Sequence, residues 1–363
     1  MNFADYLTQK LPAVEAEIMR GLPVATLAAA AAPVAATAPA ASATATTTPS
    51  ERTSADLNTY LYQPLAHFSA GGGKRVRPVL CCLGVEAVGG SAEAALPVAC
   101  AIEDFQSAAL IHDDIADKSE LRRGEKCLYK TLGTGLAINV GDSALVNVVR
   151  RVTVADHLSD QLKVRVIDAL LAMEEHTLEG QALDLGWAQN ERWDVTSEQY
   201  LFMALSKTAY YSAAYPLVLG ALIGGADQKT LDALKDFGLK VGLAFQLQDD
   251  LLNLVGNAQV QGKDFRSDIT EGKRTLAVVY ALEHLGPAEK TELVSILSAH
   301  TTDTLKLQRA VELMESANAI KFVRAHALVL VDEAKHVLEN VILTEDARDT
   351  LLSMADFFVN RER

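Results

Sequence analysis

Long stretches with helical periodicity dominate this chain and leave little room for a β-sheet. Apolar residues recur at the spacing of a helix face, whereas the Gly- and Pro-bounded alternation that indicates strands is scarce. Ala and Leu are abundant, and aromatic residues make up only 6% of the 363 residues. We therefore expect an all-α fold, a large single-domain helical bundle without internal repeats.

The periodic stretches predict where the helices lie beyond residue 50. Gly89-Gly90 and Gly224-Gly225 are typical helix stops, and Pro287 fits a first helical turn. The predicted helices are approximately 54–68, 76–89, 92–118, 134–156, 160–188, 196–224, 228–255, 273–284, 287–299, 303–315, 317–340 and 345–361.

Residues 21–53 differ in composition from the rest of the chain. Between Gly21 and Ser50 there is no charged residue, and Ala, Thr and Pro predominate. Pro33 and Pro39 interrupt any long helix, and Ala is too weakly apolar to hold a membrane span. We expect a first helix over 1–20, a flexible low-complexity insertion over 21–53, and the main domain over 54–363, without a stable membrane anchor.

Charge and cysteine content exclude several classes of protein. The net charge of −14 argues against nucleic-acid binding, which needs clustered cations. The four cysteines form no CxxC pair and no zinc-site spacing. We interpret them as buried thiols, and because the N-terminus lacks a secretory signal pattern, we expect a cytoplasmic protein.

Two carboxylate clusters are embedded in apolar, helix-forming segments: HDDIAD at 112–117 and QDDLLN at 248–253. On a helix, Asp113 and Asp117 share a face, as do Asp249 and Asn253. Divalent cations relieve the repulsion between such carboxylates, and hard oxygen ligands suit Mg²⁺. One cluster alone is more typical of a solvated acidic face, but two with apolar flanks favour a metal site.

Basic residues accompany both acidic clusters. GGGKRVRP at 71–78 places Lys74, Arg75 and Arg77 after a glycine run at the start of a helix, where an anion is favoured. The segment lacks the spacing of a P-loop. Other cations follow in largely apolar or acidic surroundings: Arg122, Arg123, Lys207, Lys263 and Lys273. The pattern indicates two diphosphate sites, one bridged by metal ions and one held by side chains.

The chain resembles the trans-isoprenyl (polyprenyl) diphosphate synthases, geranylgeranyl diphosphate synthase-like, over residues 51–363. The motifs that carry the resemblance are, in order, GGGKRVRP, DDIAD followed by LRRG, GQALD at 180–184, KT at 207–208, FQLQDD at 245–250, GKDFRSD at 262–268, EGKRT at 271–275 and the terminal NRER. The resemblance implies a helical bundle with a central active-site cavity and a prenyltransferase that condenses isopentenyl diphosphate with an allylic diphosphate.

The resemblance also implies roles for individual residues. Asp113 and Asp117 would bind two Mg²⁺ ions and Asp249 a third, with Mn²⁺ as an alternative ion. The supporting carboxylates would be Asp114, Asp250 and Asp268. Isopentenyl diphosphate would be held by Lys74, Arg77, Gln106 and Arg123. The allylic diphosphate would be held by Arg122, Lys207, Lys263 and Lys273. Asn253 stands where the family often has Asp, which puts its place among the metal ligands in doubt.

The implied chemistry needs no protein nucleophile. Metal ions and cations neutralise the leaving diphosphate, so that the allylic carbon–oxygen bond can ionise. Neutral oxygens of Thr208, Gln246 and the Lys207 backbone would steady the carbocation. The double bond of isopentenyl diphosphate then attacks it, and the released diphosphate takes the final proton.

Product length depends on the helix that carries the first aspartate cluster. Ala108 and Ala109, four to five residues before Asp113, leave room for the growing chain. Phe105 lies about one turn, roughly 5.4 Å, deeper. We hypothesise that Phe105 is part of the floor and limits the product, most simply geranylgeranyl diphosphate, to about twenty to twenty-five carbons. The alternative is that Phe105 only packs in the core.

Three other functions compete with this interpretation. A longer-chain polyprenyl diphosphate synthase would share every motif. An inert regulatory subunit of a heteromeric synthase would be expected to have lost metal or phosphate ligands, which this chain retains. A terpene cyclase would not need the second diphosphate pocket that GGGKRVRP and LRRG predict. The resemblance further implies a homodimer.

Overall fold

The computed structural model describes residues 1–23, 50–256 and 265–361. Its first half contains the elements α1 (Phe3–Arg20), α2 (Glu51–Leu57), η1 (Asn58–Tyr62), α3 (Gln63–Ala70), α4 (Val76–Ala87), α5 (Ala92–Ala116), β1 (Leu121–Arg122), β2 (Glu125–Lys126), α6 (Leu128–Leu132) and α7 (Thr134–Thr153). The two short strands form an antiparallel hairpin in which Leu121 pairs with Lys126.

Among the described residues of the second half, every regular element is a helix. This half contains α8 (Asp160–Gln189), α9 (Ser197–Ala204), η2 (Leu205–Ala214), α10 (Tyr215–Ile223), α11 (Gln228–Val255), α13 (Ser267–Thr270), α14 (Leu276–His284), α15 (Pro287–Ser298), α16 (Thr304–Ser316), α17 (Ala319–Leu338) and α18 (Glu345–Asn360). The expected all-α fold is confirmed.

Side-chain caps fix several helix starts close to the predicted positions. The Ser91 hydroxyl accepts a hydrogen bond from the Glu93 amide at the start of α5, and Asp227 accepts from Thr230 at the start of α11. Thr196 and Gln199 form a capping box before α9. The 273–284 helix begins three residues later than predicted, at Leu276, because Thr275 caps it.

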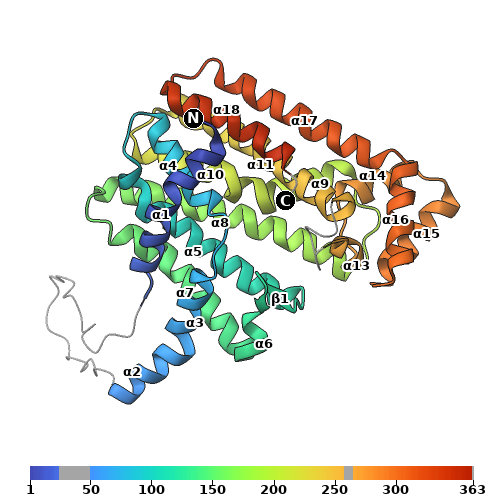
Figure 1. Cartoon of the computed structure of the whole chain (residues 1–363), viewed down its shortest axis with the longest axis horizontal. Helices are drawn as coiled ribbons and strands as arrows, with labels where there is room; N and C mark the ends of the chain where they lie inside the picture. The colour runs from blue at the N-terminus through green and yellow to red at the C-terminus, as the bar shows by residue number, and fades with distance from the viewer. Residues whose placement is uncertain (24–49, 257–264, 362–363) are drawn as a thin grey trace, which may run out of the picture.

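Helices α5 and α11 form the centre of the bundle (Figure 1). Helix α5 is apolar on nearly every side and packs against α4, α7 and α1. Helix α11 packs against η2, α10 and α17. The two acidic clusters therefore lie at the ends of the two most central helices.

The predicted helix 196–224 is interrupted by the π-helical segment η2. Glycines of both flanking helices contact η2 closely. A Cβ added at Gly180 of α8 would lie 2.2 Å from the Lys207 nitrogen, and one at Gly238 of α11 would lie 2.4 Å from Ala214. The wider π turn changes which side chains of η2 point inward, which sequence periodicity does not reveal.

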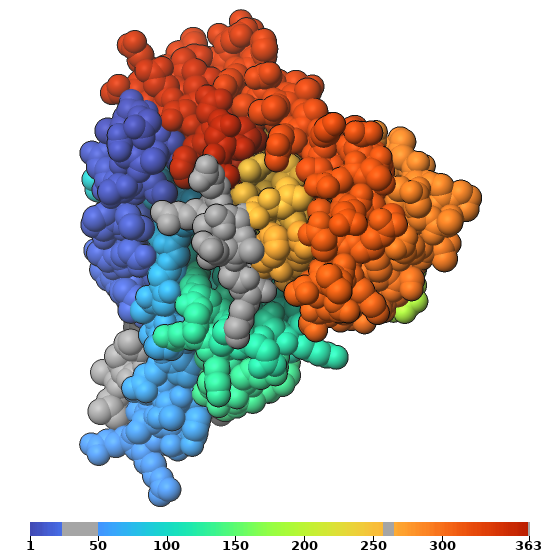
Figure 2. All heavy atoms as spheres, turned by 45° about the vertical axis from the view of Figure 1, so that its right-hand side comes forward, coloured from blue at the N-terminus to red at the C-terminus, as the bar shows by residue number. Residues whose placement is uncertain are grey.

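Helix α1 is part of the bundle although it precedes the low-complexity segment. Phe3 and Val14 are fully buried, and α1 packs against α5, α18 and α4. In Figure 2, α1 (dark blue) lies beside the segment after Glu51 (light blue) and the C-terminal helices (red). Most of the predicted insertion, residues 24–49, lies outside the described residues, and its last residues, 51–53, begin α2.

Among the described helices, α5 is long and apolar enough to cross a membrane. However, 72% of its apolar window is buried inside the molecule, as in the core helix of a bundle. The structure therefore explains the hydropathy of α5 by packing.

Candidate active site

Three cavities lie around η2 and the second half of α5. The basic cavity, about 110 Å³, is lined by residues of the loop before α4 and by α5, η2, α11 and α18. The acidic cavity, about 80 Å³, includes Asp184, Asp250 and Asp268. The apolar cavity, about 120 Å³, includes Phe105 and Asp113. Lys207 and Thr208 line both the acidic and the apolar cavity, so these two share a wall.

The first aspartate cluster lies at the C-terminal end of α5. The Asp113 carboxylate accepts a hydrogen bond of 2.7 Å from the Gln181 amide of α8. Asp117 caps the helix one turn later, on the same face. Asp114 is buried and accepts two hydrogen bonds from Arg122, at 2.9 and 2.5 Å. Arg122, predicted as a diphosphate ligand, is thus held beside the site by Asp114.

The two aspartates of the second cluster, at the end of α11, have different partners. Asp250 accepts hydrogen bonds from the Tyr200 hydroxyl at 2.5 Å and from the Gln246 amide at 2.7 Å, inside the acidic cavity. Asp249, predicted as a metal ligand, instead forms an ion pair with Arg361 near the C-terminus.

Asn253, which replaces a frequent Asp, contacts another part of the chain. Its amide donates to the Ser267 hydroxyl at 3.0 Å, and its side-chain oxygen accepts from the Asp268 amide at 3.2 Å. Asn253 therefore fixes the start of α13, and it positions Asp268 at the acidic cavity.

Two lysines lie between the aspartate clusters. Lys207 forms an ion pair with Asp184, and Lys273 contacts Glu271 at 2.6 Å and Asp268 at 3.6 Å. Burial opposes the charged form of Lys207, but the Asp184 and Asp113 carboxylates outweigh it and raise the pKa of the ammonium. Lys263, predicted as a third such lysine, lies outside the described residues.

Burial raises the pKa of several cavity carboxylates, whereas at Asp184 burial is outweighed by Lys207, which lowers the pKa of that carboxyl. Burial raises the pKa of Asp113 above the ordinary carboxyl value, and Lys207 offsets only part of this rise. Burial also raises the pKa of Asp117, against the attraction of Lys273. Burial and the nearby Asp268 raise the pKa of Asp250. A cation bound beside these groups would lower their pKa values again, because it favours the charged carboxylates.

The described residues hold no ready-made cage for a metal ion, since no three of their carboxylate, imidazole or thiol groups converge on one point. Mg²⁺ commonly takes only one or two carboxylates from the protein and completes its shell with substrate phosphates and water. The arrangement of Asp113 and Asp117 suits that second kind of site.

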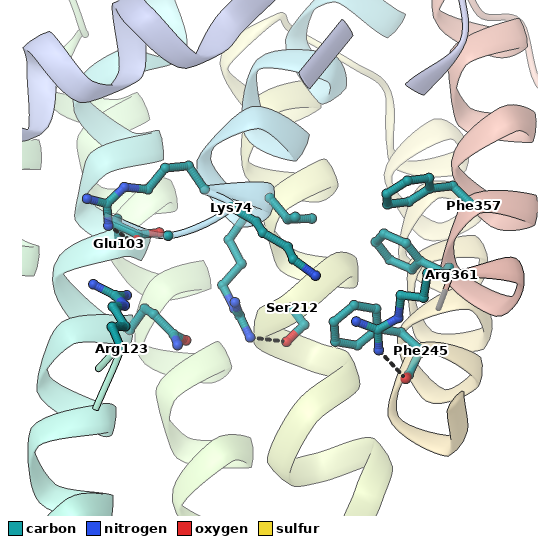
Figure 3. Close-up of a pocket in the computed structure, with 13 residues that line it drawn as sticks. Lys74, Glu103, Arg123, Ser212, Phe245, Phe357 and Arg361 are labelled. Carbon is teal, nitrogen blue, oxygen red and sulfur yellow. Dashed lines mark hydrogen bonds and ion pairs between the residues drawn. The ribbon is translucent and has the colours of Figure 1, made fainter. Parts of the chain in front are cut away.

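The four residues predicted to hold isopentenyl diphosphate line one cavity, the basic one: Lys74, Arg77, Gln106 and Arg123. Figure 3 shows Lys74 pointing between Arg123 on one side and Arg361 on the other. The Nε atoms of Arg77 and Arg361 are buried without a hydrogen-bond partner among the described residues. Both arginines line the basic cavity, and buried donors without a partner beside a cavity favour an anionic ligand.

Arg75 does not share the role predicted for the cations of the GGGKRVRP segment. Its guanidinium is fully buried and forms ion pairs with Glu15 of α1 and Glu103 of α5. The residue that looked like a phosphate ligand therefore ties two helices to the loop.

The apolar cavity runs along α5 from Asp113 to Phe105. Phe105 and Ala109 line it, as predicted, and the Phe105 ring packs edge-to-face on Tyr211 with centroids 5.8 Å apart. Ala108 lies elsewhere: it is fully buried in the cluster that includes Ile111 and Val140. Successive residues of a helix point about 100° apart, and here Ala109 faces the cavity while Ala108 faces the neighbouring core.

Several residues of the site were not singled out from the sequence: Gln181, Asp184, Tyr200, Tyr211 and Arg361. The GQALD motif contained a signal for Gln181 and Asp184, since a Gln and an Asp three apart share a helix face. Tyr200 and Tyr211 belong to no motif in the sequence. The polar contact of Tyr200 with Asp250 arises where α9 packs against α11, and that of Tyr211 with Arg77 arises where η2 packs against α4.

The sequence matches known proteins over most of its length. The model of the polyprenyl synthetase family matches residues 58–314. A short chain isoprenyl diphosphate synthase of Methanothermobacter thermautotrophicus is 41% identical over 299 residues, which cover 82% of this chain and 89% of that protein. A geranylgeranyl pyrophosphate synthase of Geoglobus acetivorans is 33% identical over 305 residues, covering 83% and 91%.

Solved structures share the fold. The geranylgeranyl pyrophosphate synthetase of Pyrococcus horikoshii Ot3 aligns with a TM-score of 0.83 and 28% identity over 99% of this chain and 98% of that one. The geranylgeranyl pyrophosphate synthase of Corynebacterium glutamicum, complexed with isoprenyl diphosphate and magnesium, aligns with a TM-score of 0.77 and 30% identity over 82% and 90%.

Proposed function

Because this chain belongs to the polyprenyl synthetase family, we propose that it is a trans-prenyltransferase. It condenses isopentenyl diphosphate with an allylic diphosphate, head to tail, and releases diphosphate. Its relatives are named short chain isoprenyl and geranylgeranyl diphosphate synthases, which favours geranylgeranyl diphosphate or a product of similar length.

The observation that carries this proposal is the placement of three chemically different cavities around η2 and the second half of α5. A condensing enzyme must hold two diphosphates with their reacting carbons together and give the growing hydrocarbon a dry space. The basic cavity offers cations for one diphosphate, the acidic cavity offers carboxylates and lysines for the other, and the apolar cavity, which includes Asp113, shares a wall with the acidic cavity.

The carboxylates suit magnesium, as in the related synthase solved with isoprenyl diphosphate and magnesium. Asp113 and Asp117 would hold metal ions together with the allylic diphosphate, and Asp249 would do so once Arg361 releases it. Bound Mg²⁺ supplies charge neutralisation for the leaving diphosphate. Lys207 and Lys273 add their charges to the same group.

Bond breaking and bond forming then need no covalent attachment to the protein. The allylic carbon–oxygen bond breaks, and its electron pair leaves with the diphosphate. The double bond of isopentenyl diphosphate donates its electrons to the allylic cation, which forms the new carbon–carbon bond. Loss of a proton to the released diphosphate restores a double bond.

Thr208 is oriented to steady the cation. Its hydroxyl donates to the Gln246 side-chain oxygen at 2.8 Å, and the Gln246 amide in turn donates to Asp250. With its proton directed at Gln246, the Thr208 oxygen can turn its lone pairs toward positive charge at the wall shared by the acidic and apolar cavities.

A second copy of the chain would complete the apolar cavity. Helix α8 presents Val164, Leu171 and Leu178 at intervals of seven residues, with 67%, 52% and 65% of each residue exposed. This spacing places them on one face, and Leu178 also lines the apolar cavity. We propose a homodimer in which the partner covers this stripe. The four buried, free thiols suit the cytoplasm.

The reaction is tested with the purified full-length chain, MgCl₂, isopentenyl diphosphate and allylic primers of increasing length. Mass spectrometry should detect a longer prenyl diphosphate, and chelation of Mg²⁺ or Asp113→Asn should remove it. An inert subunit would release no product. A cyclase would consume the allylic diphosphate without isopentenyl diphosphate and release a hydrocarbon or an alcohol, and a longer-chain synthase would give products well beyond twenty-five carbons.

A further inference from the structure

Arg75 connects the basic cavity to helix α1 through a buried network of charges. Its Nε donates to Glu15 at 2.8 Å, and its Nη1 donates to Glu103 at 2.6 Å. Its Nη2 donates to Glu15 at 3.3 Å and to the Ser69 carbonyl at 2.5 Å. With no part of this side chain exposed, these contacts must be kept, because a buried guanidinium without partners is strongly destabilising.

The backbone of the loop needs such an anchor. Arg75 has a φ of 47°, in the left-handed region, and Gly72 and Gly73 before it have φ of 80° and 143°. A residue with a Cβ does not hold this conformation by itself. Arg75 also stands between Lys74 and Arg77, both of which line the basic cavity. The direction of those two side chains therefore depends on how Arg75 is held.

Helix α1 is attached to the rest of the bundle near both of its ends. Arg151 of α7 donates to the Glu17 and Ile18 carbonyls at its C-terminal end, at 3.1 and 2.9 Å, and Arg151 is paired with Asp104 of α5. Near its N-terminal end, the Tyr6 hydroxyl donates to Glu86 of α4 at 2.6 Å. Between these two attachments, α1 presents Glu15 to Arg75.

Glu103 links the same network to the other side of the cavity. The Glu103 carboxylate attracts Arg123 as well as Arg75. A Cβ at Gly73 would lie 3.2 Å from the Arg123 guanidinium. In Figure 3, Glu103 and Arg123 occupy one side of the cavity, and Lys74 points into it from the loop.

We propose that Glu15 of α1 is a positioning residue for isopentenyl diphosphate. It acts through Arg75: together with Glu103 it fixes the glycine-rich loop so that Lys74 and Arg77 face the bound diphosphate. This inference rests on the proposed function, and it gives the N-terminal helix a part in substrate affinity. Glu15 itself does not touch the substrate.

The test compares Glu15→Gln with Glu86→Gln in the full-length chain. Both substitutions remove one carboxylate that attaches α1 to the body, but only Glu15 contacts Arg75. We expect Glu15→Gln to raise KM for isopentenyl diphosphate about fivefold to tenfold, with KM for the allylic diphosphate and kcat within about twofold. Glu86→Gln should leave all three within about twofold, and thermal unfolding checks that both variants are folded.

A double-mutant cycle separates positioning from general loosening. Arg75→Lys keeps the charge but loses the forked hydrogen bonds, and we expect it to raise the same KM. If Glu15 acts through Arg75, Glu15→Gln has little further effect in the Arg75→Lys background. The inference would be overturned if the effects of Glu15→Gln and Arg75→Lys on KM for isopentenyl diphosphate multiplied in the double variant. It would also be overturned if Glu15→Gln raised the KM values of both substrates equally, or if Glu86→Gln raised KM for isopentenyl diphosphate as much as Glu15→Gln. If the unsubstituted chain formed no product at all, the proposed function would fail instead.

Discussion

At the residue scale, the proposed role of Phe105 in setting product length can be tested by substitution. It lines the apolar cavity eight residues, or about 12 Å of helix, before Asp113. Replacing the ring by a methyl group opens the space that it fills beside Tyr211. We expect Phe105→Ala to lengthen the product by about one isoprene unit or more, measured by mass spectrometry of the prenyl alcohols after phosphatase treatment.

The control substitution should change product length in the opposite direction. Ala109→Phe places a ring in the same cavity nearer to Asp113 and should shorten the product. Because Phe→Ala in a core costs about 3–5 kcal/mol of stability, Phe105→Leu serves as a milder enlargement. Unchanged product length in all three folded variants would assign Phe105 to core packing alone.

Glu174 of α8 gives a residue-scale prediction about pH. Its Oε1 atom is buried without a hydrogen-bond partner among the described residues, and burial raises its pKa to about 7. A raised carboxyl pKa means that the folded state keeps a proton that the unfolded chain has lost. Its contribution to stability is therefore present in full below about pH 4, the unfolded pKa, and is lost as pH rises through about 7.

Glu174→Gln keeps the shape and cannot ionise. We expect the free energy of unfolding of the variant, measured by urea titration, to rise relative to that of the parent by about 1 kcal/mol between pH 5 and pH 8, after allowance for solvent screening. A parallel pH dependence of the two proteins would show that the Glu174 side chain is well solvated. Glu175→Gln, the same change at an exposed residue of the same helix, is the matched control.

At the element scale, the position of η2 decides which side chains form the site. Lys207, Thr208 and Tyr211 all project from it, and the backbone of Lys207 rests directly on Gly180 of α8. Helix propensity did not reveal this break, because a π turn is maintained by the packing of its neighbours. The sequence predicted one continuous helix through 196–224, which is wrong at this segment.

Gly180→Ala should therefore displace η2. The added Cβ would lie 2.2 Å from the Lys207 nitrogen, too close for any real contact. We expect a loss of about tenfold to a hundredfold in kcat/KM, since displacements near 1 Å are this costly, measured by steady-state kinetics. Gly186→Ala on the same helix meets nothing within 4 Å and should keep full activity. Equal activities of the two variants would contradict the role given to the contact.

At the scale of the whole molecule, the exposed apolar stripe on α8 favours an interface with a second copy of the chain. The proposed homodimer buries Val164, Leu171 and Leu178, and Leu178 is also part of the cavity wall. Exposed apolar surface of this regularity is typical of an interface. The proposed dimer would also influence product length, because in a monomer the apolar cavity would be open to solvent at Leu178.

Leu171→Asp should convert the dimer into a monomer. A buried charge without a partner is strongly unfavourable at an interface, whereas Leu171 is half-exposed in the single chain and its replacement should not unfold it. Light scattering coupled to size exclusion measures the mass. Leu305→Asp on α16, at an isolated exposed leucine, should leave the mass unchanged. A dimer that survives Leu171→Asp would place the interface elsewhere.

The local features of this protein were determined by its sequence. Cap residues such as Ser91 and Asp227, together with apolar periodicity, place most helix starts within a few residues. The motif order indicated the family, and the residues predicted for isopentenyl diphosphate do share one cavity. These are properties of short segments, in which neighbours along the chain decide the conformation.

Tertiary structure decided what each charged residue contacts. From the sequence, Arg75 could bind either a phosphate or a carboxylate, and the folded structure shows that it pairs with Glu15 of α1. Asp249 pairs with Arg361, more than a hundred residues later in the sequence. Ala108 and Ala109 differ only in the direction that α5 gives them. Charge pairing and burial depend on which elements pack together, and that is a property of the folded chain as a whole.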